Sequence, residues 1–161
     1  MSDCEVVTLK ETVLVECCTA RGVLMQGELF LRPLDTTGRG ERLLDVLAGR
    51  AFVPLRTAEE TVVFLAPRHL AWVRLGLLAA LDELDPEAED DASSAVARVV
   101  VELAHGAALE GTLRYALPAM TRRLGDYLER APAFFPLRTA DWIYLLNAAQ
   151  VASITPLSES R

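Results

Sequence analysis

The chain has 161 residues, of which 52% are hydrophobic, 6% aromatic and 24% charged, and its formal net charge is −7. At about 150 residues per domain this length fits one domain or two small ones, and the high apolar fraction excludes a disordered chain. No apolar run reaches about 18 residues, so we expect no membrane-spanning helix. The polar start, with Asp3, is unlike a secretory signal.

Acidic residues are concentrated in one segment. Residues 76–95 contain seven acids and no base, which leaves 16 bases against 16 acids in the rest of the chain. We expect an acidic linker that begins with a short helix over 76–84 and continues as exposed, mobile chain. A neutral body does not attract nucleic acid, and an acidic linker repels phosphate. The linker is interpreted as solvated chain, with a docking segment for a basic partner as the alternative.

The three cysteines are Cys4, Cys17 and Cys18. Their number is odd, two of them are adjacent, and none has the spacing of a zinc or redox site. We predict that Cys17 or Cys18 points inward from a strand as a small hydrophobe, with a disulfide between the two as the alternative. Free thiols favour the reducing cytoplasm as the location.

The clearest signal is an internal repeat. The segment FVPLRTA at 52–58 recurs as FFPLRTA at 134–140. The flanking segments also agree: a Gly-x4-Gly-x-Leu pattern occurs twice, 84 positions apart, and an Arg-x2-Asp-x-Leu pattern occurs twice, 81 positions apart. We therefore predict a first module over 1–75, the acidic linker over 76–95, and a second module over 96–161.

Each module reads as two strands, a helix and two more strands. In the second module we expect a strand over 97–104, a turn at 105–106, and a second strand over 108–117. Gly111 interrupts that second strand, which indicates a sharp bend or a close backbone approach. A helix over 121–131 capped by Thr121, a short strand over 134–138 and a hairpin over 142–157 complete it. The first module repeats this order with a longer loop before its helix.

The segment 101–113 carries Val-x-Leu-x2-Gly-x2-Leu-x-Gly-x-Leu and resembles the first motif of Sm-like small β-barrels. The segment 146–154 is similar to the hydrophobic frame of their second motif. The resemblance implies a barrel built on a strongly bent strand. The RNA-contacting residues of Sm-like proteins are not matched, since Asn147-Ala148 and Ala66-Pro67 stand where those proteins have Arg-Gly. Each module is also similar to small uncharacterised bacterial domains with an Arg-x2-Asp-x-Leu helix, and that likeness implies no activity.

Candidate interaction residues come from the repeated motifs. Each Arg-x2-Asp pair spans one helical turn, where an ion pair is natural, and we interpret the pairs as structural, with a ligand-binding arginine as the alternative. The arginine of each PLRTA segment is interpreted as paired with a neighbouring acid or carbonyl, with an anion site as the alternative. Trp72 and Trp142 are not equivalent, so one of them is a candidate for contact with a partner. The candidates are Arg42, Asp45, Arg123, Asp126, Arg56, Arg138 and Trp72.

Residue types for chemistry are few. His69 and His105 fall at non-equivalent places without acids at ligand spacing, so no metal site is expected. No nucleophile elbow and no phosphate-binding glycine loop is present, so we expect neither a catalytic site nor a cofactor.

The sequence thus predicts a mainly β (α+β) protein with two Sm-like barrel modules packed as a pseudo-dimer through a two-fold interface. The expected function is non-enzymatic: protein binding, scaffolding or self-association through exposed edge strands. Two alternatives stay open. A face that clusters Arg21, Arg56, Arg98 and Arg138 would favour a nucleic-acid binder, and a pocket on the pseudo-two-fold axis between the modules, lined by Arg42 and Arg123, would favour a small-ligand sensor.

Overall fold

A computed structural model describes residues 11–31, 41–77, 94–116 and 123–160. Strands dominate these residues, and two short α-helices and two 3-10 turns accompany them. No helix in this part of the chain is long and apolar enough to cross a membrane. The elements are β1 (Glu11–Thr19), β2 (Leu24–Leu31), α1 (Leu43–Gly49), β3 (Val53–Arg56), β4 (Val62–Leu65), η1 (Pro67–His69), β5 (Leu70–Gly76), β6 (Ser94–Leu103), β7 (Ala108–Ala116), α3 (Leu124–Glu129), β8 (Phe134–Arg138), β9 (Trp142–Asn147), η2 (Ala148–Gln150) and β10 (Val151–Ser160).

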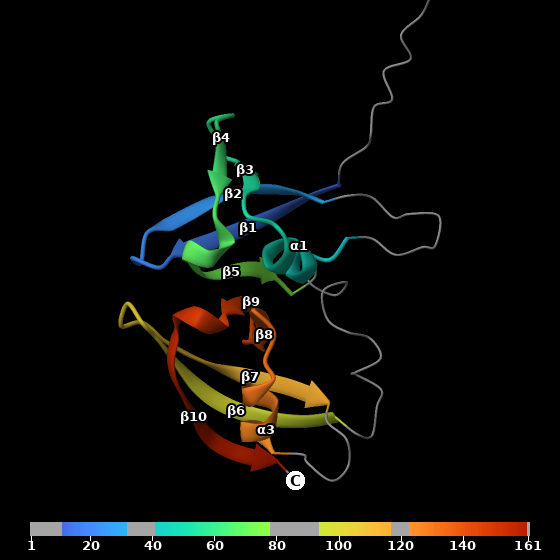
Figure 1. The fold of residues 1–161 in the computed structure, drawn as a ribbon, viewed down its shortest axis with the longest axis vertical. Helices are drawn as coiled ribbons and strands as arrows, with labels where there is room; N and C mark the ends of the chain where they lie inside the picture. The colour runs from blue at the N-terminus through green and yellow to red at the C-terminus, as the bar shows by residue number, and fades with distance from the viewer. Residues whose placement is uncertain (1–10, 32–40, 78–93, 117–122, 161) are drawn as a thin grey trace, which may run out of the picture.

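The ten strands form one antiparallel sheet in the order β10-β6-β7-β8-β9-β5-β1-β2-β3-β4. The sheet curls twice, so that residues 11–77 form one curved half and residues 94–160 form another (Figure 1). We call these the first half and the second half. Within each half the last strand of the chain segment pairs with its first strand, and the second, third and fourth strands follow in order.

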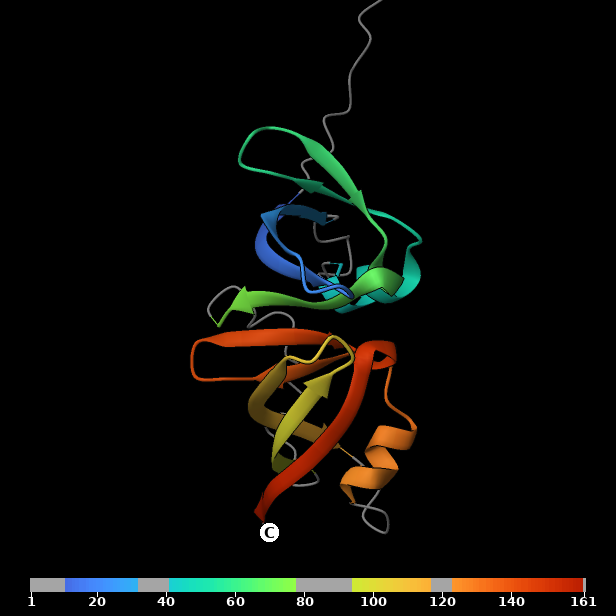
Figure 2. The same cartoon turned by 90° about the vertical axis from the view of Figure 1, so that its left-hand side faces the viewer.

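The two halves are joined head to tail. Strand β5, the last of the first half, pairs with β9, the fourth of the second half, from Trp72↔Leu146 to Gly76↔Trp142. A two-fold interface would pair the same strand from both halves, so the prediction of a two-fold joint is wrong. The arrangement leaves β4 at one end of the molecule and β10 at the opposite end, as two views show (Figures 1 and 2).

We call the contact between the two halves, where β5 pairs with β9, the joint. The apolar cores of the two halves interlock there. Side chains alternate between the two faces of a strand, so Ile143 and Leu145 of β9 pack into the core of the first half. Phe134 of β8 joins them there, and helix α1 contacts β8. In the other direction, Ala71 and Trp72 of β5 belong to the core of the second half. Each half therefore completes the core of the other.

Two glycines allow neighbouring strands to approach closely. A Cβ built on Gly111 would lie 2.7 Å from the carbonyl oxygen of Arg138 and 2.8 Å from Cγ of Leu137. Gly27 stands against the carbonyl oxygen of Arg56 in the same way. A side chain at either position would separate the strands, which explains the glycine at the centre of both bent strands. The close backbone approach predicted at Gly111 is confirmed.

Several local predictions can be compared with the structure. Cys17 and Cys18 are both free and buried, and they face different cores because adjacent strand residues point to opposite faces. Helix α3 begins after Arg123, which is its N-cap, so the prediction of Thr121 as the cap is wrong. Gly76 ends strand β5, so it does not start a helix. The remaining predictions for 78–93 lie outside the described residues.

Candidate functional site

The repeated PLRTA arginines lie at corresponding places on the two halves. Arg56 forms an ion pair with Glu28 on the neighbouring strand, with Nη2 and Oε2 2.5 Å apart. Beside it is a pocket of about 290 Å³, and Arg138 lines a pocket of about 510 Å³ at the corresponding place in the second half. Arg98, also on that pocket, pairs with exposed Glu110 at 2.6 Å.

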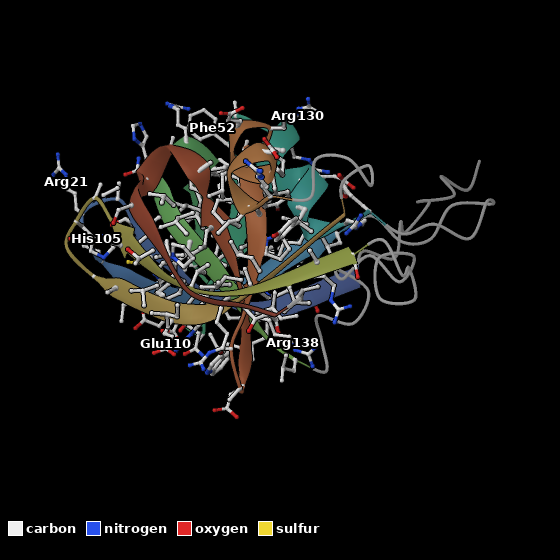
Figure 3. All side chains as sticks on the ribbon, turned by 90° about the horizontal axis from the view of Figure 1, so that it is seen from below. Arg21, Phe52, His105, Glu110, Arg130 and Arg138 are labelled. Atoms are coloured by element: carbon white, nitrogen blue, oxygen red, sulfur yellow. The ribbon has the colours of Figure 1, made fainter. Side chains whose placement is uncertain are left out.

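This placement bears on both alternatives to protein binding. Arg98 and Arg138 share one pocket, Arg56 lines the other, and Arg21 lies beside the His105 turn, well away from Arg138 (Figure 3). The four arginines therefore do not form the single basic face that would favour nucleic-acid binding. Neither pocket is lined by Arg42 or Arg123, so neither is the pocket that would favour a small-ligand sensor.

The Arg-x2-Asp pattern marks the start of each helix. Arg42 is the N-cap of α1, and its carbonyl accepts hydrogen bonds from the backbone N–H of Asp45 (3.0 Å) and of Val46 (3.1 Å). Arg123 takes the same place before α3. Asp45 and Asp126 lie in the first helical turn, where the helix dipole favours a carboxylate.

Trp72 lies inside the joint between the halves. It is 7% exposed and packs edge-to-face against Tyr144 of β9, with ring centroids 5.1 Å apart. Next to it, the guanidinium of Arg74 stands 4.2 Å from the ring centroid of Trp142 and donates to the Tyr144 hydroxyl and to Glu16, each at 2.9 Å. These aromatic and charged groups hold β5 against β9, and Trp72 is not available at the surface.

Asn147 also fastens the joint, and the sequence did not single it out for this role. Its side chain is buried, and its Nδ2 donates to the carbonyl oxygen of Leu70 in the first half at 2.9 Å. Its Oδ1 accepts from the backbone N–H of Ala149 at 3.0 Å. Because a buried amide needs such partners, Asn147 fixes how the two halves meet.

The most informative surface is the end of the first half. Phe52, Val62 and Phe64 are 55%, 47% and 68% exposed, although such side chains are usually buried in strands. Val62 and Phe64 lie on β4, which pairs only with β3 in the described sheet. We call these three residues the β4 patch. None of the three is among the candidate interaction residues, because an apolar residue in or beside a strand predicts burial in the core.

Candidate chemistry is sparse in the described part of the chain. No group of three or more His, Cys, Asp or Glu side chains there is placed to hold a metal ion. Burial raises the pKa of the Cys17 thiol to about 12 and also raises that of Cys18, so neither is a reactive thiolate at neutral pH.

The chain was compared with protein-family models, with curated proteins and with solved structures, and none of them matches.

Proposed function

We propose that the protein is a non-enzymatic interaction or scaffold protein, built from two tandem modules of the Sm-like type and working in the cytoplasm. The β4 patch is the observation that carries this proposal. Two of its side chains lie on an edge strand, where a partner strand can add to the sheet through backbone hydrogen bonds. An exposed apolar surface beside such an edge is typical of a protein-binding site.

The correspondence between the halves supports the tandem interpretation. Both hairpins turn in the same way, with Thr19 N–H bound to Val23 O at 2.9 Å and Leu103 N–H bound to Ala107 O at 2.8 Å. Pro54 pairs with Phe64, and Pro136 pairs with Leu145, so the third and fourth strands have one register in both halves. Gly27 of β2 and Gly111 of β7 also correspond to each other, and each packs closely against the neighbouring strand.

The proposal is tested by affinity capture from nuclease-treated native lysate. The bait proteins are the wild type, Phe64→Glu, and Leu24→Glu as a matched control at a similarly exposed apolar residue of β2. We expect protein captured by the wild type and by Leu24→Glu to be lost with Phe64→Glu. Capture of RNA, or of proteins released by nuclease, would overturn the proposal in favour of nucleic-acid binding. Capture of the same protein by all three baits would show that the β4 patch is not the binding surface.

A further inference from the structure

We infer that the β4 patch of one chain binds the β10 end of a second copy, so that the joint inside each chain is repeated between chains. This rests on the proposed function and names the partner that the patch fits.

The β4 patch corresponds, residue by residue, to the side chains that enter the joint. Because Pro54↔Phe64 and Pro136↔Leu145 pair in the same register, Phe64 corresponds to Leu145, and Val62 therefore corresponds to Ile143. Phe52 and Phe134 begin the matching segments FVPLRTA and FFPLRTA.

Burial separates the two sets sharply. Phe134 is 4% exposed, and Ile143 and Leu145 are fully buried in the core of the first half. The β4 patch supplies three of the seven large apolar side chains that are exposed among the described residues, and Leu157 of β10 is another. The first half therefore presents the apolar side chains of a joint without the surface that would cover them.

The opposite end of the molecule corresponds to that covering surface. In the joint, β5 pairs with β9 and α1 contacts β8. The buried α1 residues Val46 and Leu47 lie in the core that includes Phe134. Their counterparts in α3 are Tyr127 and Leu128, which are only partly buried. Strand β10 pairs only with β6 in the described sheet, so its outer edge is open to a further strand.

The internal register predicts which residues meet between chains. Val73 pairs with Leu145 in the joint, and the matching positions of η1 and η2 place Ile154 where Val73 stands. A second copy in the same arrangement would therefore pair Ile154 with Phe64. Since β4 and β10 are different surfaces, the contact is heterologous, and repeating it gives a ring or an open chain of copies.

The contact between chains is weaker than the internal joint. β10 has Pro156 where β5 has Leu75, and a proline cannot donate to a strand ladder. Thr155 stands in place of Arg74, and Ala66 stands in place of Asn147, so the arginine stacking and the buried amide are both absent. Assembly should therefore depend on protein concentration.

The test mixes two singly substituted chains in a Cys4→Ser background and oxidises them. One chain carries Phe64→Cys and the other carries Ile154→Cys, while Leu24→Cys replaces Phe64→Cys in the control mixture. We expect a disulfide-linked pair from the first mixture, at least tenfold more than from the control, and its yield should fall on dilution. In a separate experiment without cysteine substitutions at these positions, Phe64→Glu should remove the increase in mass that the wild-type chain shows with concentration.

Two results would overturn the inference. A linked pair formed equally well between two Phe64→Cys chains would show that β4 edges pair with each other. No linked pair above the control, together with the mass of a single chain at every concentration, would exclude a second copy as the partner. In that case, capture of a protein that depends on Phe64 would still support the proposed function. If no linked pair forms and no captured protein depends on Phe64, the proposed function is rejected as well.

Discussion

Replacing Phe134 and Phe52 separately by alanine compares the same residue type at corresponding positions with opposite burial. Phe134 is buried in the core of the first half, so truncation removes its apolar contacts and leaves a cavity, which costs about 3–5 kcal/mol. Phe52 is mostly exposed and has a cation–π contact with Arg68 at 5.7 Å. Its truncation should cost less than about 1 kcal/mol.

Thermal melts of the dilute protein measure this difference. For a chain of this length each kcal/mol shifts the Tm by about 2–4 °C, so Phe134→Ala should lower the Tm by roughly 6–20 °C and Phe52→Ala by less than about 4 °C. Dilution keeps any contact between copies from stabilising Phe52. Equal shifts for the two variants would refute the assignment of Phe134 to the joint and of Phe52 to an open surface.

Three further predictions concern the interior. Gly111→Ala should cost about 1–3 kcal/mol in urea melts because its Cβ meets a neighbouring strand, whereas Gly125→Ala, with open space in α3, should stabilise the protein by about 0.5–1 kcal/mol; a neutral Gly111→Ala would contradict the close approach. Asn147→Ala leaves the carbonyl of Leu70 without its donor and should cost about 1–3 kcal/mol, so an unchanged urea midpoint would count against the clamp. Burial raises the pKa of Cys17 from 9.0 to about 12, so the unfolded chain loses this proton first and the free energy of unfolding falls as pH rises from 9 towards 12. The fall from Cys17 should be roughly 1.5 kcal/mol between pH 9 and 10.5. Cys17→Ala should remove this part and leave a smaller slope from Cys18, whose pKa burial also raises; the same pH slope in both proteins would contradict this.

Short-range sequence patterns were enough to predict part of the fold. The predicted β-rich fold is confirmed, as is the close approach at Gly111, because alternation of apolar residues and an isolated glycine are short-range signals. The head-to-tail joint could not be predicted in this way, since a strand sequence does not state which edge it will pair with. The exposure of Phe64 could not be predicted either. An apolar residue in a strand predicts burial, and Phe64 is exposed because β4 is the last strand of the described sheet.

The candidate site was predicted less well than the fold. The sequence singled out arginines, and the structure places Arg56 in an ion pair and Arg42 at a helix start. Asn147 was noted only as a departure from the Sm-like pattern, because its hydrogen bond to Leu70 spans two distant segments of chain. The partners of Arg56 and Asn147 both lie on distant segments of the chain, and a single sequence does not show which segments meet.

Sedimentation velocity over a wide range of concentrations tests whether β4 and β10 are the two open sides of a joint that two copies of the chain form. The measurement compares the wild type with Phe64→Glu and with Leu24→Glu, a control at a similarly exposed apolar residue. We expect the masses of the wild type and of the control to rise with concentration, while Phe64→Glu keeps the mass of one chain. A wild-type protein that keeps the mass of one chain throughout, or a Phe64→Glu variant that assembles as the wild type does, would contradict it.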